Sequence, residues 1–173
     1  RGLKLKQCSS CLAGFYSNTI SYEPCIRCNM GSASSIIGSI NCNNCERGKY
    51  ANNKWHTECK NCDAGYYNNI QGGINCDACE MGKYLPSTGS TLETDCKICL
   101  EGEVSGIGSS RCDRCSGGEY KSGVNECRKC PKGKYGENIG GNNIDYCQNC
   151  PVGKYIDQIG QTSINSCKSC IAG

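Results

Sequence analysis

Residues 127–135 read Cys-Arg-Lys-Cys-Pro-Lys-Gly-Lys-Tyr, and residues 147–155 read Cys-Gln-Asn-Cys-Pro-Val-Gly-Lys-Tyr. All 20 cysteines of the 173-residue chain belong to such Cys-x-x-Cys pairs. The pairs begin at residues 8, 25, 42, 59, 76, 96, 112, 127, 147 and 167. A motif that recurs at this interval along the whole chain predicts an array of small structural repeats over residues 1–173.

Each pair is followed by a glycine three residues after its second cysteine and usually by an aromatic residue two residues later. The glycines include Gly14, Gly48, Gly65, Gly82, Gly133 and Gly153, and the aromatic residues are Tyr16, Tyr50, Tyr67, Tyr84, Tyr120, Tyr135 and Tyr155. Ala33 and Val104 take the aromatic position in two repeats. A glycine here suits a turn with positive φ. A tyrosine in the strand that follows suits a half-buried face.

The rest of each repeat is a polar loop, which predicts the second half of a β-hairpin. Glycine and asparagine in segments 70–74 (Ile-Gln-Gly-Gly-Ile) and 139–144 (Ile-Gly-Gly-Asn-Asn-Ile) indicate hairpin tips. We expect a strand to return from each tip to the next cysteine. The lysines between glycine and tyrosine are expected to point to solvent; they are Lys49, Lys83, Lys134 and Lys154. No window shows helical periodicity, and the glycine content disfavours helix.

Composition indicates that disulfides, rather than a hydrophobic core, hold the chain together. Cysteine is roughly 12% of the residues, above the ~8–10% typical of a disulfide scaffold, whereas Phe and Trp occur once each. The predicted fold class is a small disulfide-rich all-β chain with little hydrophobic core. It would be a linear array, or rod, of about nine short two-stranded hairpins, on the order of 100 Å long.

Two regular disulfide patterns are compatible with this spacing, since sequence alone does not fix connectivity. In a crossed pattern, Cys8 joins Cys25 and Cys11 joins Cys28. In a ladder, the second cysteine of each pair joins the first of the next, and we favour it because every bond closes one hairpin. The ladder bonds are Cys11–Cys25, Cys28–Cys42, Cys45–Cys59, Cys62–Cys76, Cys79–Cys96, Cys99–Cys112, Cys115–Cys127, Cys130–Cys147 and Cys150–Cys167. Cys8 and Cys170 would then pair with neighbouring repeats outside this segment.

The repeated Cys-x-x-Cys-x-x-Gly-x-Tyr unit resembles the ephrin-receptor-like and growth-factor-receptor-like cysteine-rich repeats found in large extracellular proteins of protists. Its Cys-Pro-x-Gly-Lys-Tyr core, at 130–135 and 150–155, is also similar to the first submodule of tumour-necrosis-factor-receptor domains. The resemblance covers nearly the whole chain. It implies an extended, adhesive or structural disulfide array without catalytic residues or cofactors. The departures are Ala33 and Val104, and proline follows the pair in two repeats.

These features predict an extracellular or cell-surface structural protein and not an enzyme. We expect a stalk, coat or fibre segment of a longer, secreted protein that associates with copies of itself or with neighbouring repeats. The alternative is a receptor or adhesin ectodomain, in which the unit around Val104 and the longer loops 80–95, 131–146 and 151–166 bind a protein ligand. A net charge of +3 is too weak to predict nucleic-acid binding, and no apolar run is long enough for a membrane span.

Rival chemistries have weaker support. Neighbouring pairs are close to the spacing of four-cysteine zinc sites, but the spacing varies along the chain. Redox catalysis would need a helix N-terminus beside the thiol, and the sequence predicts no helix. His56 lies in a loop, so we expect a surface side chain rather than a catalytic base, and the 142–145 segment (Asn-Asn-Ile-Asp) lacks the carboxylates of an EF-hand. No Asn-x-Ser/Thr sequon occurs, so any glycan would be O-linked, for example at residues 87–91.

Overall fold

The structure is a computed structural model that describes residues 10–18, 24–123 and 125–171. These residues form nine separate two-stranded antiparallel sheets, so the predicted series of hairpins and the all-β class are confirmed. The paired strands are β1 (Phe15–Tyr16) with β2 (Ile26–Arg27), β3 (Ser32–Ala33) with β4 (Asn43–Asn44), β5 (Lys49–Tyr50) with β6 (Lys60–Asn61), β7 (Tyr66–Tyr67) with β8 (Asp77–Ala78), β9 (Lys83–Tyr84) with β10 (Lys97–Ile98), β11 (Glu103–Val104) with β12 (Asp113–Arg114), β13 (Glu119–Ser122) with β14 (Glu126–Lys129), β15 (Lys134–Tyr135) with β16 (Gln148–Asn149), and β17 (Lys154–Tyr155) with β18 (Lys168–Ser169).

Nine disulfides join these hairpins in the ladder pattern, each linking the second cysteine of one pair to the first of the next. They are Cys11–Cys25, Cys28–Cys42, Cys45–Cys59, Cys62–Cys76, Cys79–Cys96, Cys99–Cys112, Cys115–Cys127, Cys130–Cys147 and Cys150–Cys167. We number the repeats 1 to 9 by these bonds, in chain order. Among the described cysteines, Cys170 is free and exposed, and Cys8 lies outside the described residues.

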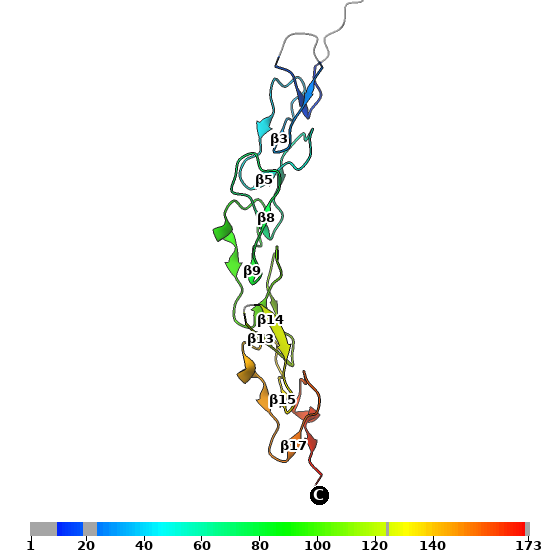
Figure 1. The fold of residues 1–173 in the computed structure, drawn as a ribbon, viewed down its shortest axis with the longest axis vertical. Coiled ribbons are helices and arrows are strands. Elements are labelled where there is room, and N and C mark those ends of the chain that lie inside the picture. Colours follow the sequence, from blue (N-terminus) through cyan, green and yellow to red (C-terminus); the bar gives the residue numbers. More distant parts are fainter. Residues whose placement is uncertain (1–9, 19–23, 124, 172–173) are drawn as a thin grey trace, which may run out of the picture. The chain divides into compact units, whose positions relative to one another are not determined.

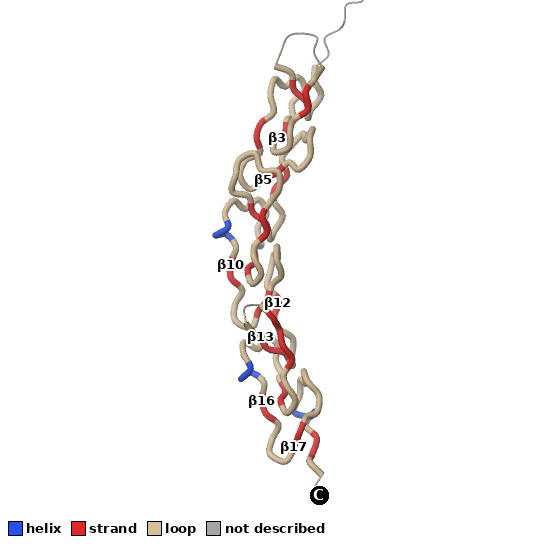
Figure 2. Tube along the Cα trace, in the orientation of Figure 1, coloured by secondary structure: helices blue, strands red, loops and turns tan. Residues whose placement is uncertain are grey.

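The second strand of each hairpin lies in an unexpected place. We expected it to lead up to the next cysteine, but in eight of the nine hairpins it consists of the two residues inside the Cys-x-x-Cys pair, and in repeat 7 it also includes Cys127 and Glu126. In repeat 3, for example, Tyr50 pairs with Lys60, which directly follows Cys59. The strands are therefore mostly two residues long and occupy only the base of each hairpin, while loops form the rest (Figure 2).

Three loops carry an additional 3₁₀ turn, namely η1 (Glu93–Asp95), η2 (Ile144–Tyr146) and η3 (Ile164–Ser166). They belong to repeats 5, 8 and 9, whose disulfides span 17 residues, whereas the first four span 14. The three extra residues thus form one helical turn just before the closing cysteine. In η2 the side chain of Asn143 accepts a hydrogen bond from the Asp145 amide (2.8 Å), which caps the turn.

The described residues form two compact units. Unit 1 contains the described residues up to Asp77 together with Ser87–Asp95, and unit 2 contains Ala78–Pro86 together with the described residues from Cys96 onward. Within each unit, successive hairpins follow one another along that unit (Figure 1). The prediction that residues 1–173 form a single continuous array remains a prediction.

Cysteine makes up most of the core. The largest fully buried side chains are those of Cys28, Cys45, Cys62, Cys79, Cys115 and Cys130, each the second cysteine of its pair. Most isoleucines are exposed, and Ile156, at 4% exposure, is the buried one among those described. Burial of sulfur therefore replaces the aliphatic packing of an ordinary domain. None of the described helices has the length and apolar character required to cross a membrane.

Candidate functional site

The region with the most regular geometry is the contact between each loop and the repeats before it. In repeat 4 the tip amide of Gly72 donates a hydrogen bond to the carbonyl of Cys45, which begins repeat 3 (2.7 Å). The same bond recurs as Gly38 to Cys11, Trp55 to Cys28, Gly89 to Cys62, Gly108 to Cys79, Gly140 to Cys115 and Gly160 to Cys130, at 2.7–3.0 Å. The loops of these seven repeats are thus each hydrogen-bonded to the cysteine that opens the preceding repeat.

Backbone hydrogen bonds from residues on either side of the first strand of a hairpin add to this contact. The amide of Gly48 donates to the carbonyl of Asn68 (2.8 Å), and the amide of Ala51 donates to the carbonyl of Gly73 (3.1 Å). Both donors belong to repeat 3 and both acceptors to repeat 4. Since these groups would otherwise need water or another partner, the loop of one repeat completes the hydrogen bonding of its neighbour.

Five of these loop tips also contact the repeat that lies two places earlier in the chain. A Cβ atom on Gly48 would overlap the carbonyl oxygen of Gly89, which lies two repeats further along the chain. Equivalent overlaps occur at Gly14 with Trp55, Gly31 with Gly72, Gly102 with Gly140 and Gly118 with Gly160. The motif glycines thus have two functions, because all nine of those described have positive φ and these five leave room for a tip.

Most of the motif tyrosines are partly buried, but one is buried and one is exposed. Tyr135 is buried at 5% exposure, and its hydroxyl donates to Gln148 Oε1 (3.0 Å). Tyr155, in the last described hairpin, is 43% exposed. Partly buried tyrosines are Tyr16, Tyr50, Tyr67, Tyr84 and Tyr120.

The lysines beside the tyrosines were expected to point to solvent. Two of them, Lys49 and Lys83, form ion pairs with Glu46 (3.4 Å) and Glu80 (2.9 Å).

Sequence reasoning missed the position directly after the aromatic residue, which is buried in most repeats. The buried residues there are Ser34, Ala51, Asn68, Leu85, Ser105, Gly136 and Ile156. Their types differ widely, so composition provides no common signal. Spacing alone, three residues after the motif glycine, could have identified them.

Two of these residues connect repeats through side chains. Asn68, 2% exposed, donates from Nδ2 to the carbonyl of Lys49 (2.7 Å) and accepts from the amide of Ile70 (3.1 Å). Ser105, 5% exposed, donates from Oγ to the carbonyl of Lys83 (2.8 Å), and its amide donates to Asn125 Oδ1 (2.7 Å). Buried polar side chains of this kind stabilise because they satisfy backbone groups of the adjoining repeat.

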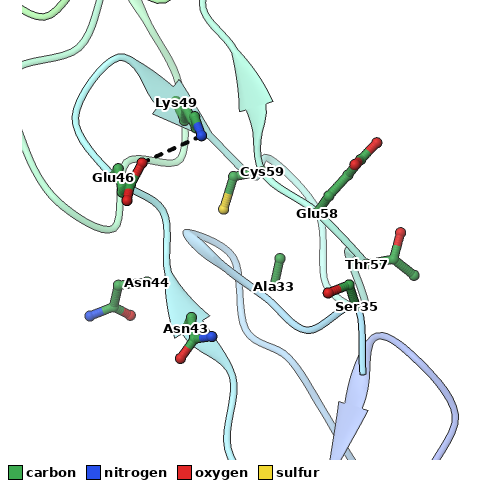
Figure 3. Close-up of a pocket in the computed structure, with 9 residues that line it drawn as sticks. All are labelled: Ala33, Ser35, Asn43, Asn44, Glu46, Lys49, Thr57, Glu58 and Cys59. Carbon is green, nitrogen blue, oxygen red and sulfur yellow. Dashed lines mark ion pairs between the residues drawn. The ribbon is translucent and has the colours of Figure 1, made fainter. Parts of the chain in front are cut away.

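Between repeats 2 and 3 lies a shallow polar hollow of about 320 Å³. Figure 3 shows the side chains that line it: Ala33, Ser35, Asn43, Asn44, Glu46, Lys49, Thr57, Glu58 and Cys59. Glu46 is paired with Lys49 at one side, and the sulfur of Cys59 is bonded to Cys45. The hollow can therefore offer amide, hydroxyl and carboxylate hydrogen bonds to a ligand, and its cysteine is not available as a nucleophile.

Other candidates from the sequence have ordinary structural surroundings. His56 Nε2 lies 3.3 Å from Asn52 Oδ1 within the same loop. Asn142 donates from Nδ2 to Glu101 Oε2 (3.1 Å), so the 142–145 segment is a polar turn. With eighteen cysteines in disulfides, no group of three or more metal-ligating side chains occurs within the described part of the chain.

Two ionisable groups have shifted pKa values. Partial burial raises the pKa of Tyr146, whose ring packs against the backbone of Gly136 and Gly141 and whose hydroxyl donates to the carbonyl of Asn138. A side-chain hydrogen bond from Lys168 lowers the pKa of Asp157, and the two groups form an exposed ion pair (3.2 Å). Neither group lines the polar hollow, and both shifts have local structural causes.

Comparison with known proteins agrees with this architecture. The family described as "Tyrosine-protein kinase ephrin type A/B receptor-like" matches residues 48–96 and 120–167, together more than half of the chain. A search of curated proteins gave no match. This family of repeats is not a class of enzymes, and with nine disulfides it favours an extracellular location. The chain belongs to the ephrin-receptor-like family of cysteine-rich repeats.

Proposed function

We propose that this chain is an extracellular structural segment, a disulfide-stapled spacer within a stalk, coat or fibre. The observation that carries the proposal is the backbone hydrogen bonding of seven loops to the preceding repeat, as between Gly72 and Cys45. A hairpin held by its own disulfide and by its neighbour resists bending more than hairpins joined by free linkers. Stiffness over a distance is the property that a spacer requires.

The proposal includes association between copies of the chain. Exposed aliphatic side chains support it, for example Ile36, Ile37 and Ile40 in repeat 2, which are 66%, 65% and 71% exposed. Their loop, residues 34–41, carries no charge. Apolar surface of this kind is characteristic of interaction sites. A second copy has the same spacing between its loops, so the two surfaces could match over several repeats.

Small-angle X-ray scattering combined with sedimentation velocity tests both parts. A compact chain of this length would have a radius of gyration of about 16 Å. We expect a considerably larger value at low concentration, together with a mass that increases with concentration. A compact radius would contradict the spacer. An elongated particle that stays monomeric at every concentration would retain the spacer and eliminate self-association.

A further inference from the structure

Trp55 is the loop tip of repeat 3, and its backbone conformation is unusual. Its amide makes the regular bond to the carbonyl of Cys28 (3.0 Å) with a φ of 62°. Every other tip that makes this bond is a glycine, with φ between 69° and 82°: Gly38, Gly72, Gly89, Gly108, Gly140 and Gly160. Among the described residues, Trp55 is the one non-glycine residue with positive φ.

This conformation has a cost that the hairpin itself does not require. A left-handed conformation costs a side-chain-bearing residue roughly 1–2 kcal/mol, and glycine would make the same backbone bond without it. Residues held in such conformations cluster at functional sites. The indole side chain is therefore expected to have a function apart from the fold.

The side chains around Trp55 are of the types that dominate binding sites. The guanidinium of Arg27, in β2, lies 4.7 Å from the Trp55 ring centroid and 6.0 Å from that of Phe15. These are the single Trp and the single Phe of the chain, and both contact the same arginine. Trp55 is 53% exposed, and no ion pair of Arg27 occurs within the described part of the chain. Exposed tryptophan and arginine are the residues that contribute most to recognition.

The polar hollow adjoins this cluster through the same loop. Thr57 and Glu58 follow Trp55 in the chain and line the hollow (Figure 3). The carbonyl of His56 accepts a hydrogen bond from the amide of Ser34 (3.2 Å), which fixes the loop beside Ser35, another residue that lines the hollow. An exposed ring and a hollow lined by amides and hydroxyls are thus held next to one another.

We propose that Trp55, Arg27 and Phe15, together with this hollow, bind a neutral oligosaccharide. A sugar ring presents an apolar C–H face that can pack on the indole, and its hydroxyls require hydrogen-bond donors and acceptors in a polar site. Asn43, Asn44 and the hydroxyls of the hollow provide them. Arg27 and Lys49 balance the charges of Glu46 and Glu58, so the site has no net charge and favours a neutral ligand over an acidic peptide or a phosphate-rich ligand.

The single tryptophan provides a direct assay. The protein would be titrated with tetrasaccharides of glucose, of mannose and of N-acetylglucosamine while Trp fluorescence and its quenching by iodide are recorded. We expect a saturable change in emission and reduced quenching with at least one of the three sugars. No saturable change with any of them at millimolar concentration would overturn the proposal, and so would binding of poly-glutamate without binding of sugar.

Variants would separate binding from folding. Trp55→Gly removes the indole but relieves the backbone strain, so the variant should fold and should bind the sugar at least about tenfold more weakly by calorimetry. Arg27→Gln keeps the fluorescent reporter and should also weaken binding. The matched control is Lys168→Gln, which removes a similar exposed cation–ring contact with Tyr155 (6.0 Å) in repeat 9. Equal affinity in Trp55→Gly and the parent, or equal weakening in the control, would refute the site.

Discussion

At the scale of single residues, two motif glycines separate the cost of a positive φ from the cost of a close contact with another repeat. Gly48 and Gly153 have nearly the same φ, 78° and 79°. A Cβ on Gly153 would meet nothing within 4 Å, whereas one on Gly48 would overlap the carbonyl of Gly89. Gly153→Ala should therefore cost only the positive-φ penalty of roughly 1–2 kcal/mol. Gly48→Ala should cost about 1–3 kcal/mol more, because backbone must move. Thermal unfolding with disulfides intact would compare the two variants, and equal losses would contradict the close contact between Gly48 and Gly89.

Asn68 provides a second test at this scale, because its neighbour is a natural control. Asn68→Ala removes the hydrogen bonds to Lys49 and Ile70 and leaves the carbonyl of Lys49 unsatisfied. The expected loss of stability is about 1–3 kcal/mol. Asn69 is exposed, so Asn69→Ala should change stability by less than about 0.5 kcal/mol. Denaturant unfolding of both variants measures the difference, and similar midpoints would indicate that the buried amide does not link repeats 3 and 4.

At the scale of elements, the loop of repeat 8 should respond to alkaline pH through Tyr146, the last residue of η2. Its pKa is higher in the folded chain than in the unfolded chain, mainly because of burial. Folding therefore favours the protonated phenol, and its contribution is complete below the unfolded pKa near 10 and is lost as pH rises through the folded value. Tyr146→Phe should remove this part of the alkaline loss of stability. Unfolding midpoints measured from pH 8 to 11 would check this, and parallel curves would exclude the contribution.

Some elements could be predicted from sequence and others could not, for physical reasons. The nine hairpins follow from regular cysteine spacing and from a glycine that always precedes the first strand. The second strands were misplaced because two polar residues, such as Lys60 and Asn61, carry no recognisable β-pattern. The contact of Gly48 with Gly89 joins residues that are distant in sequence and has no local signature. The position of Trp55 could not be predicted, because sequence does not reveal that it occupies a tip where other repeats have glycine.

At the scale of the whole molecule, the oxidation state of the cysteines distinguishes a disulfide array from a zinc array. Nine disulfides leave Cys170, which is exposed, and Cys8, which lies outside the described residues. The denatured, non-reduced chain should therefore react with no more than two equivalents of a thiol reagent, with or without a chelator. A count near twenty, accompanied by release of zinc, would contradict the disulfide array.

The loop contacts determine how many neighbouring repeats each repeat stabilises. This number can be measured by removing one end of the chain. Deleting residues 150–173 removes repeat 9, whose loop bonds to repeat 8 through Gly160 and Cys130 and reaches repeat 7 at Gly118. Repeat arrays couple only over such contacts. Hydrogen exchange should therefore increase in repeats 7 and 8 and stay unchanged in repeats 1 to 6, with eight disulfides still formed. Faster exchange throughout the chain would mean that folding is cooperative over the whole array, and stability would then not be a sum of local terms.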